Sequence, residues 1–298
     1  MKVLVLLALA AVASARNVEP LAPVEQSEAP LSAYGYIRDY AIPLAEEIRK
    51  AEEQMTSERI VGGSPSGLGE FPYQAGLLAE YPGVSGTGVC GASLVSANRL
   101  ITAAHCWFDG RDQAWRLTVV LGSLFLFTGG TRVQTTNVVM HPDWRPSIIR
   151  NDVAVIYLPS NVAFTNTISP ISLPSSTELN LSFAGSSAVA SGYGLTSNSG
   201  AISSNQVLSH VNLNVISNVV CLPAFPLNLH SSNICTSGVG GTSTCRGDSG
   251  GPLVVTNNNR RIMIGITSFG SGLGCSAGLP AVFARVTSFM SFFNQHIA

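Results

Sequence analysis

Gly247-Asp248-Ser249-Gly250-Gly251-Pro252 is the stretch of this 298-residue chain that constrains fold and chemistry most. A serine hydroxyl is a poor nucleophile unless an imidazole takes its proton, and the imidazole needs a buried carboxylate to fix its tautomer. The glycines allow a sharp backbone turn, so that the amides of Gly247 and Ser249 can form an oxyanion hole. The stretch therefore predicts that the fold brings one histidine and one aspartate to Ser249.

Two motifs upstream can supply these partners. They read Thr102-Ala103-Ala104-His105-Cys106 and Asn151-Asp152-Val153-Ala154-Val155. A histidine or an aspartate alone is more often structural than catalytic, but both motifs together with the glycine-rich serine stretch have a negligible rate of chance occurrence. His105, Asp152 and Ser249 are therefore the candidate catalytic residues.

The serine stretch also fits the G-x-S-x-G nucleophile elbow of the α/β-hydrolases. That fold requires the chain order serine, acid, histidine, with strands that alternate with helices. No Asp or Glu follows Ser249 in this chain, and His296 is the only histidine after it. The order of residues argues against a lipase or an esterase.

Residues 60–298 have the pattern of an all-β fold. Short runs of Val, Ile, Leu and Thr recur between clusters of Gly, Ser, Asn and Pro, and many short strands at close spacing indicate a barrel or a sandwich. Helical spacing is found only in Val286 to Ile297. The clearest strand candidates are Arg116 to Leu121, Thr135 to Met140, Val153 to Leu158, Val207 to Val215, Leu253 to Thr256 and Arg261 to Ser268.

With these motifs, residues 60–298, from Ile60-Val61-Gly62-Gly63 onward, resemble the trypsin and chymotrypsin family of serine endopeptidases. The resemblance implies two six-stranded antiparallel β-barrels with the active site between them and a C-terminal helix. It also implies His105 as general base, Asp152 as its orienting partner and Ser249 as nucleophile. Because all three positions are intact, a non-catalytic homologue used for binding is the weaker alternative.

All six cysteines lie after residue 89, and their even number in an exported chain indicates disulfides. A zinc site would require a closely spaced Cys pair, but the two closest cysteines here are ten residues apart. Counting alone leaves the connectivity open. The family resemblance implies the pairs Cys90–Cys106, Cys221–Cys235 and Cys245–Cys275.

Residues 1–15, MKVLVLLALAAVASA, read as a secretory signal peptide. They combine a basic start, an apolar run of about ten residues and a small-residue cleavage site, whereas a membrane span needs roughly 20 apolar residues. We therefore expect a secreted, extracellular protein with no membrane partner.

Residues 16–59 differ in composition from the rest, with nine acidic residues against five basic ones and no cysteine. Apolar residues recur at spacings of four and three, with Pro43 best placed in the first turn of a helix. The helix serves either for packing or for a specific binding or inhibitory role, and the sequence leaves this open. The apolar face consists of Ile37, Ala41, Leu44, Ile48, Ala51 and Met55.

The bond Arg59–Ile60 joins this acidic segment to the domain, so residues 16–59 resemble an activation propeptide. In the family, cleavage creates an α-amino group on the residue equivalent to Ile60, and that ammonium pairs with the carboxylate next to the nucleophile, here Asp248. A buried carboxylate is costly without a partner, and its pairing orders the Gly247 amide. Arg59 indicates a trypsin-like activating protease.

The resemblance assigns the specificity pocket to Ser243 at its base, Ser268 and Gly270 at its entrance and Ala281 on its wall. No acid occurs between Glu178 and Asp248, and a neutral base excludes a buried cation because of its desolvation cost. We expect cleavage after large apolar residues: Phe, Tyr, Leu or Met. Elastase-like specificity is the alternative, but it would require a bulky residue at 270.

The charge pattern restricts the partners. The formal net charge is −1, and no run of Lys or Arg exceeds two residues, which argues against a nucleic acid. No carboxylate lies between Asp112 and Asp143, where many relatives hold calcium, so we expect neither a metal nor a cofactor. The expected partners are protein and peptide substrates and protein protease inhibitors, and the expected state is a monomer.

Both lysines, Lys2 and Lys50, precede the cleavage site, and the ten basic residues of 60–298 are all Arg. Arg keeps its charge in alkaline surroundings in which Lys begins to lose it. This bias resembles that of chymotrypsin-like proteases of the insect, and especially the lepidopteran, midgut, which implies digestion in the gut lumen. A regulatory protease of an extracellular cascade is the alternative.

Asn180-Leu181-Ser182 is a possible glycosylation site.

Overall fold

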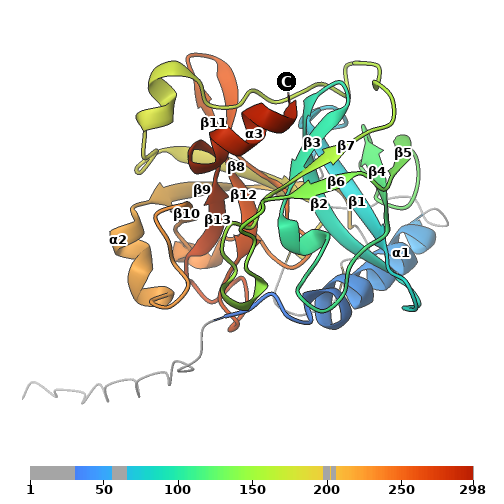
Figure 1. The fold of residues 1–298 in the computed structure, drawn as a ribbon, viewed down its shortest axis with the longest axis horizontal. Helices are drawn as coiled ribbons and strands as arrows, with labels where there is room; N and C mark the ends of the chain where they lie inside the picture. The colour runs from blue at the N-terminus through green and yellow to red at the C-terminus, as the bar shows by residue number, and fades with distance from the viewer. Residues whose placement is uncertain (1–30, 56–65, 197–201, 203–205, 298) are drawn as a thin grey trace, which may run out of the picture.

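The computed structural model describes residues 31–55, 66–196, 202 and 206–297 (Figure 1). The expected signal peptide and the Arg59–Ile60 bond lie outside this part of the chain. Within it, strands dominate and form two antiparallel, barrel-like sheets, which confirms the all-β class.

The first sheet has the strand order β5-β4-β1-β2-β3-β7-β6. It consists of β1 (Gln74–Glu80), β2 (Thr87–Ser96), β3 (Arg99–Thr102), β4 (Arg116–Leu121), β5 (Thr131–Thr135), β6 (Val138–Met140) and β7 (Ala154–Tyr157). The seventh strand, beyond the six expected, comes from a stretch that changes partner at residues 136–137: β5 pairs with β4, and β6 pairs with β7. The two edges of the sheet are thereby joined through the chain.

In the middle of this sheet, β1, β2 and most of β4 bury both of their faces. Leu77 of β1 and Val119 of β4 belong to the main core, whereas their neighbours Leu78 and Val120 belong to a second apolar cluster. Successive side chains of a strand project to opposite faces, so a further layer must cover the outer face. That layer is the helix α1 (Ile42–Met55), drawn in blue beside the first sheet in Figure 1.

The second sheet closes into a barrel in the order β10-β13-β12-β11-β8-β9. Its strands are β8 (Ser187–Gly192), β9 (Ser209–Ile216), β10 (Asn233–Thr236), β11 (Pro252–Asn257), β12 (Arg260–Phe269) and β13 (Ala281–Arg285). Inward-facing Leu213, Ile234 and Phe283 fill it as one buried cluster. The expectation of a six-stranded barrel is confirmed for this half.

Helices lie at the two ends of the described chain. A π-helical turn, Ile37–Ala41, leads into α1, where Pro43 lies in the first turn as expected. The C-terminal helix α3 (Met290–Ile297) follows a 3₁₀ turn and returns to the first sheet, where Nδ1 of His296 hydrogen-bonds to the Tyr157 hydroxyl (2.7 Å). A short helix, α2 (Asn218–Cys221), flanks the second barrel.

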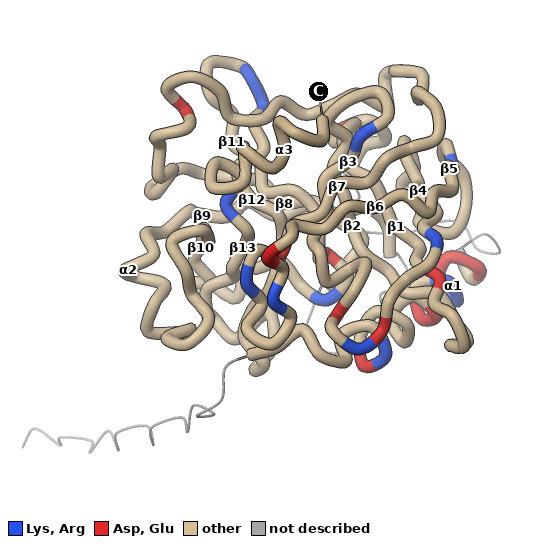
Figure 2. The backbone as a smooth tube through the Cα atoms, viewed as in Figure 1, with Lys and Arg blue, Asp and Glu red and all other residues tan. Residues whose placement is uncertain are grey.

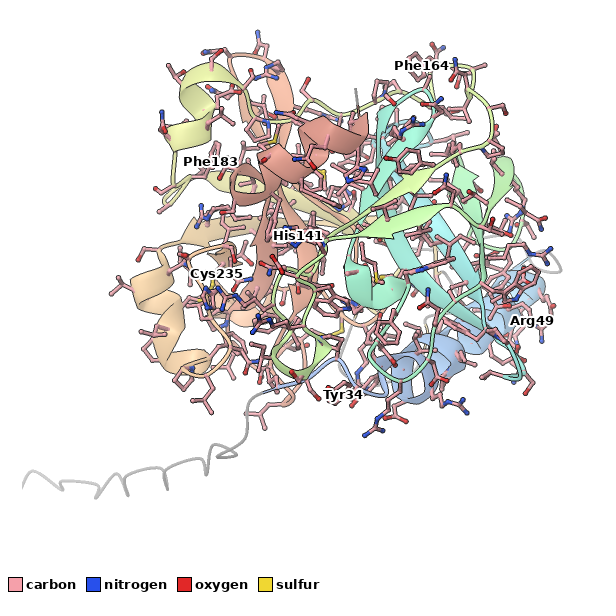
Figure 3. All side chains as sticks on the ribbon, viewed as in Figure 1. Tyr34, Arg49, His141, Phe164, Phe183 and Cys235 are labelled. Carbon is pink, nitrogen blue, oxygen red and sulfur yellow. A yellow bond between two sulfur atoms is a disulfide. The ribbon has the colours of Figure 1, made fainter. Side chains whose placement is uncertain are left out.

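Charged residues are sparse on the sheets and gather on α1 (Figure 2). Arg49 lies on the outer side of this helix (Figure 3) and forms ion pairs with Glu46 and Glu53 of the same helix. The helix therefore presents most of its charges to water and its apolar side to the sheet, and the buried Glu52 is an exception. Among the described residues, no helix has the length and apolar character that a membrane crossing requires.

The structure forms the three disulfides that the resemblance implies. Cys90–Cys106 lies beside the histidine motif, Cys221–Cys235 in the second barrel and Cys245–Cys275 beside the serine stretch.

Candidate active site

His105 and Asp152 form a buried pair in the first sheet. His105 lies in a 3₁₀ turn (Ala104–Cys106) directly after β3, and Asp152 lies just before β7, the strand that pairs with β3. Nδ1 of His105 is 2.7 Å from Oδ2 of Asp152, and the side chains are 3% and 2% exposed. A carboxylate only accepts, so Nδ1 carries the proton and Nε2 is left as a base.

The carboxylate of Asp152 also fixes its surroundings. Its Oδ1 accepts the backbone amide of His105 (2.9 Å), and its Oδ2 accepts the Ser268 hydroxyl (2.6 Å). The preceding residue, Asn151, has φ +58°, a left-handed conformation that Asn tolerates better than most residues, and its side chain donates to the carbonyl of Asp143 (2.9 Å). The conformation of Asn151 and the hydrogen bonds of Asp152 therefore hold the Asp152 carboxylate against His105.

Ser249 lies in a turn between the two sheets. Its carbonyl accepts the amide of Gly91 in β2 (2.7 Å), and the next amide, Gly250, donates to the carbonyl of Thr267 in β12 (2.8 Å). Gly250 has φ +81°, and a Cβ there would collide with Thr102. The glycine after the serine is therefore required for the two sheets to approach each other at Ser249.

Gly247 has φ +95°, a conformation that favours glycine. Within the described part of the chain, the amides of Gly247 and Ser249 donate no backbone hydrogen bond. Two free donors next to a serine hydroxyl match the requirement for stabilising an oxyanion.

The carboxylate of Asp248 lies against the end of β8, beside Gly192 and Gly194. Its two oxygens accept the amides of Gly194 (2.9 Å) and Cys245 (2.8 Å). Burial raises its pKa to about 6, although these two hydrogen bonds oppose the rise. The carboxylate lines a cavity of about 240 Å³, and no cation forms an ion pair with it among the described residues. It is a buried acid beside an open space.

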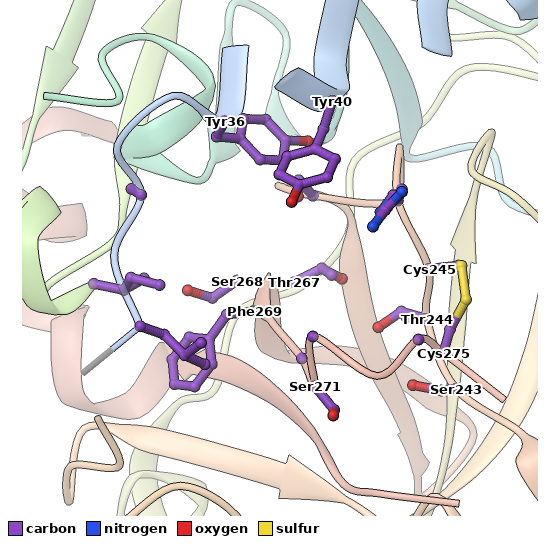
Figure 4. Close-up of a pocket in the computed structure, with 18 of the residues that line it drawn as sticks. Tyr36, Tyr40, Ser243, Thr244, Cys245, Thr267, Ser268, Phe269, Ser271 and Cys275 are labelled. Atoms are coloured by element: carbon purple, nitrogen blue, oxygen red, sulfur yellow. A yellow bond between two sulfur atoms is a disulfide. The ribbon is translucent and has the colours of Figure 1, made fainter. Parts of the chain in front are cut away.

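A second cavity, of about 420 Å³, has His105 and Ser249 in its lining. Figure 4 shows other residues of this lining, among them Ser243 and Ser268. Ser243, Ser268 and Gly270, three of the four residues expected in the specificity pocket, line it, and no carboxylate does so among the described residues. A Cβ on Gly270 would meet no atom within 4 Å. The cavity therefore offers no acidic group to a cationic side chain, its lining includes Arg246, and a side chain at position 270 would have free space.

Ala281 differs from expectation. It lies in β13, 2% exposed, opposite Thr236 of β10, and belongs to the core of the second barrel. It is not among the residues that line the 420 Å³ cavity. The structure therefore gives its methyl group no direct part in the shape of that cavity.

One cluster has the composition of a metal site. Ligand atoms of Cys90, His105 and Cys106 lie within 4.8 Å of one another. The two sulfurs form a disulfide with each other, and metal binding needs a thiolate. The cluster is therefore not a metal site in the oxidised protein.

Asn180, the possible glycosylation site, is exposed at the end of a 3₁₀ helix (Ser176–Asn180).

Sequence reasoning missed one part of the site. Leu31, Tyr36 and Tyr40, all from the acidic segment, line the same cavity as His105 and Ser249. Figure 4 shows Tyr36 and Tyr40 on one side of the cavity and Ser243 on the other. Two tyrosines four residues apart at the start of the predicted helix were the available signal, because that spacing places both on one face.

Comparisons with known proteins agree with this geometry. Residues 60–293 match the family model for trypsin. The chain is 38% identical to collagenase of Hypoderma lineatum over 82% of this chain and 89% of that protein. It is 36% identical to brachyurin of Leptuca pugilator over 78% of this chain and 96% of that protein. The solved structure of HL collagenase superposes with a TM-score of 0.71 at 37% identity, over 80% of this chain and 98% of that one. The chain belongs to the trypsin family and is a serine endopeptidase.

Proposed function

We propose that this protein is a secreted protease precursor that is activated by cleavage at Arg59–Ile60 and then cuts peptide bonds after large apolar residues. The observation that carries the specificity is the cavity beside Ser249 and His105, which has Ser243 and Gly270 in its lining and, among the described residues, no carboxylate. The signal-like residues 1–15 support secretion.

The chemistry follows from the pair His105–Asp152. Nε2 of His105 is buried and has no hydrogen-bond partner among the described residues, so it is available to take the proton of the Ser249 hydroxyl. The serine oxygen attacks the substrate carbonyl, and the amides of Gly247 and Ser249 bind the resulting oxyanion. His105 then gives the proton to the leaving amine, and water hydrolyses the acyl-enzyme by the same route.

The activation step is supported by the environment of Asp248. Its raised pKa indicates a carboxylate that lacks a compensating charge, and the 240 Å³ cavity gives access to it. A new ammonium group on Ile60 would supply that charge. Pairing would fix Asp248 and, through the chain, the neighbouring amide of Gly247.

Digestion is the setting that we propose, because the ten basic residues of 60–298 are all Arg. Arg keeps its charge at a pH at which Lys does not. A protease of an extracellular cascade is the alternative, and comparison of gut fluid with haemolymph for the protein separates the two.

The test uses the whole precursor, activated with trypsin, and peptides that differ only in Phe, Leu, Ala or Arg before the scissile bond. We expect kcat/KM for Phe and Leu to exceed that for Arg by at least ~100-fold, because no acid pairs with a buried cation. Arg cleaved as fast as Phe would refute the pocket assignment. Ser249→Ala is the control, and it should abolish all cleavage.

The relatives named collagenase suggest a second candidate substrate, native collagen. The same activated enzyme, incubated with triple-helical collagen and with heat-denatured collagen, separates the two activities. Cleavage of only the denatured form would indicate general digestion without collagenase activity.

A further inference from the structure

The segment before the cleavage site, residues 31–55, lies in the catalytic cleft. The ring of Tyr36 lies edge-on to the His105 imidazole, with centroids 4.5 Å apart and an interplanar angle of 78°. Its hydroxyl is 3.9 Å from Sγ of Cys90, and Tyr36 lines the same cavity as His105 and Ser249. One side chain thus covers the two residues between which a substrate carbonyl would have to enter.

Two further residues on the same side of the segment cover the remaining parts of the site. Tyr40 stacks under the guanidinium of Arg246, which is 4.4 Å from the ring centroid. The side chain of Leu44 lies so close to Gly247 that a Cβ there would be 2.7 Å from Leu44 Cδ2. Residues 36, 40 and 44 are four apart, so one face of the segment covers the imidazole, the nucleophile and an oxyanion-hole glycine together.

The same face continues onto the outer side of the first sheet. Leu44, Ala45 and Ile48 form one buried cluster with Leu78 and Val120 of the sheet. Ile48 is 1% exposed. This apolar contact does not involve the catalytic residues, so it can hold the segment in place independently of them.

Polar contacts fix the position of the segment at both ends. The amide of Ile37 donates to Oδ2 of the buried Asp109 (3.0 Å), and Arg38 forms a two-pronged pair with Asp112 (2.6 and 2.7 Å). At the other end, the carboxylate of Glu52 accepts the amides of Leu126 (2.5 Å) and Phe127 (2.9 Å).

The segment is not bound as a substrate. The backbone of Leu31 exchanges hydrogen bonds with the side chain of Asn228, and the amide of Ala33 donates to the carbonyl of Pro146. Among the described residues, no backbone hydrogen bond joins 31–36 to 267–270, the strand end beside Ser249. Without such hydrogen bonds, the segment is not held in the way that an extended substrate strand would be held.

None of these contacts involves the Arg59–Ile60 bond, and residues 16–59 hold no cysteine to tether them. We propose that residues 31–55 are a built-in inhibitor that remains in the active-site cleft after that bond is cut, so that activity requires release of the segment as well as cleavage. This inference rests on the proposed function, and it deepens the account of how the same site is regulated.

The experiment starts from the full precursor, cleaved with limiting trypsin that is then stopped by a Lys-directed chloromethyl ketone. Native gel filtration with mass spectrometry asks whether a fragment containing 31–55 co-elutes with the domain. Activity on a Phe peptide is measured at once, and again after dilution has released the fragment. We expect co-elution, low initial activity and a rise on dilution that is reversed by adding the fragment back.

Tyr36→Ala should weaken inhibition by the fragment about 10- to 100-fold, the range for a buried aromatic residue at an interface. Glu52→Ala, which removes the acceptor of the Leu126 and Phe127 amides, should weaken it too. Glu47→Ala, on the exposed side of the same helix, is the matched control and should behave as wild type. None of these residues belongs to the mature domain.

Full activity at the moment of cleavage, with the fragment eluting separately, would overturn the inference and leave the proposed function intact. If neither wild type nor Tyr36→Ala cleaves any peptide after fragment release, the proposed function fails. Co-elution would then still decide whether the segment is retained.

Discussion

Asp152 accepts three hydrogen bonds, and each has a different consequence. The bond from Nδ1 of His105 sets the tautomer, the bond from the His105 amide fixes the turn that carries the ring, and the bond from Ser268 links the pair to β12. Removing one donor leaves the carboxylate two others. Several hydrogen bonds therefore hold the pair in one geometry. Such redundancy suits a catalytic site, because a displacement of about 1 Å can lower the reaction rate greatly.

Gly270 gives the sharpest test of specificity at a single residue. A side chain there meets open space, so Gly270→Val should fill the cavity without loss of stability. We expect kcat/KM for Phe to fall ~100-fold or more, while that for Ala is largely retained. Gly67→Val is the matched control, because Gly67 is exposed, does not line the cavity, and its Cβ would meet only Oε2 of Glu70 at 3.9 Å. Equal losses for Phe and Ala in Gly270→Val would contradict the assignment.

Asp248 should make the stability of the precursor depend on pH. Its folded-state pKa is raised to about 6 by burial, so the neutral acid is favoured by folding. The stabilisation is fully present below the unfolded value of ~3.9 and is lost as pH rises through 6, by at most about 2–3 kcal/mol. Denaturant unfolding of uncleaved wild type and Asp248→Asn from pH 4 to 8 measures it.

The Asn variant should lack this slope, and any fixed offset from its amide group does not change with pH. A wild-type precursor as stable at pH 8 as at pH 4, relative to the variant, would contradict the assignment. In the cleaved enzyme, an ammonium partner should remove the slope as well, because it stabilises the carboxylate.

Glu52 should make the binding of residues 31–55 weaker at high pH. Burial raises the pKa of its carboxyl group, against the opposing effects of the Leu126 and Phe127 amides and of Arg132. Its contribution to binding is therefore full below the ordinary Glu value and lost as pH rises through the raised one. The dissociation constant of the fragment, measured from pH 4 to 9, should rise in wild type and in Glu47→Gln. It should be flatter in Glu52→Gln.

At the scale of elements, the helix α1 tests how strongly residues 31–55 are bound to the domain, because it forms most of that segment. Ile48→Ala leaves a gap in the cluster with Leu78 and Val120, at a cost of about 2–4 kcal/mol. That corresponds to ~30- to 1000-fold in the dissociation constant of the fragment. Lys50→Ala, on the exposed side, is the control and should change little. Gel filtration of the cleaved precursor at falling concentration reports the difference.

The same helix shows what periodicity can and cannot predict. Spacings of three and four located the helix and its apolar face, with Pro43 in the first turn. They could not identify the surface that covers the face, because periodicity reports burial and not the partner. The change of strand partner at 136–137 and the inward position of Ala281 were missed for a related reason. The change of strand partner and the burial of Ala281 both depend on how the sheets close into barrels. Short-range sequence patterns do not predict that closure.

At the scale of the whole molecule, the candidate site lies on the seam between the two sheets. His105 and Asp152 come from the first sheet, Ser249 from the turn before β11, and the amide of Gly91 in β2 holds the carbonyl of Ser249. The motifs predict the three residues as a set, because each lies at a position with a local backbone requirement that the sequence shows. Their distances could not be predicted, since the docking of the sheets sets them.

The apolar cluster beneath α1 has a consequence for the lifetime of the enzyme. While the helix is in place, Leu78, Val89 and Val120 are shielded from water. When the helix leaves, this apolar face becomes exposed to water, at a free-energy cost of about 25 cal/mol per Å². The amides of Leu126 and Phe127 also lose their hydrogen bonds to the carboxylate of Glu52. The precursor should therefore be more stable than the enzyme that has lost the helix. Incubated at one temperature with its nucleophile blocked, the freed enzyme should aggregate sooner than its precursor, so that the event that starts catalysis also limits its duration.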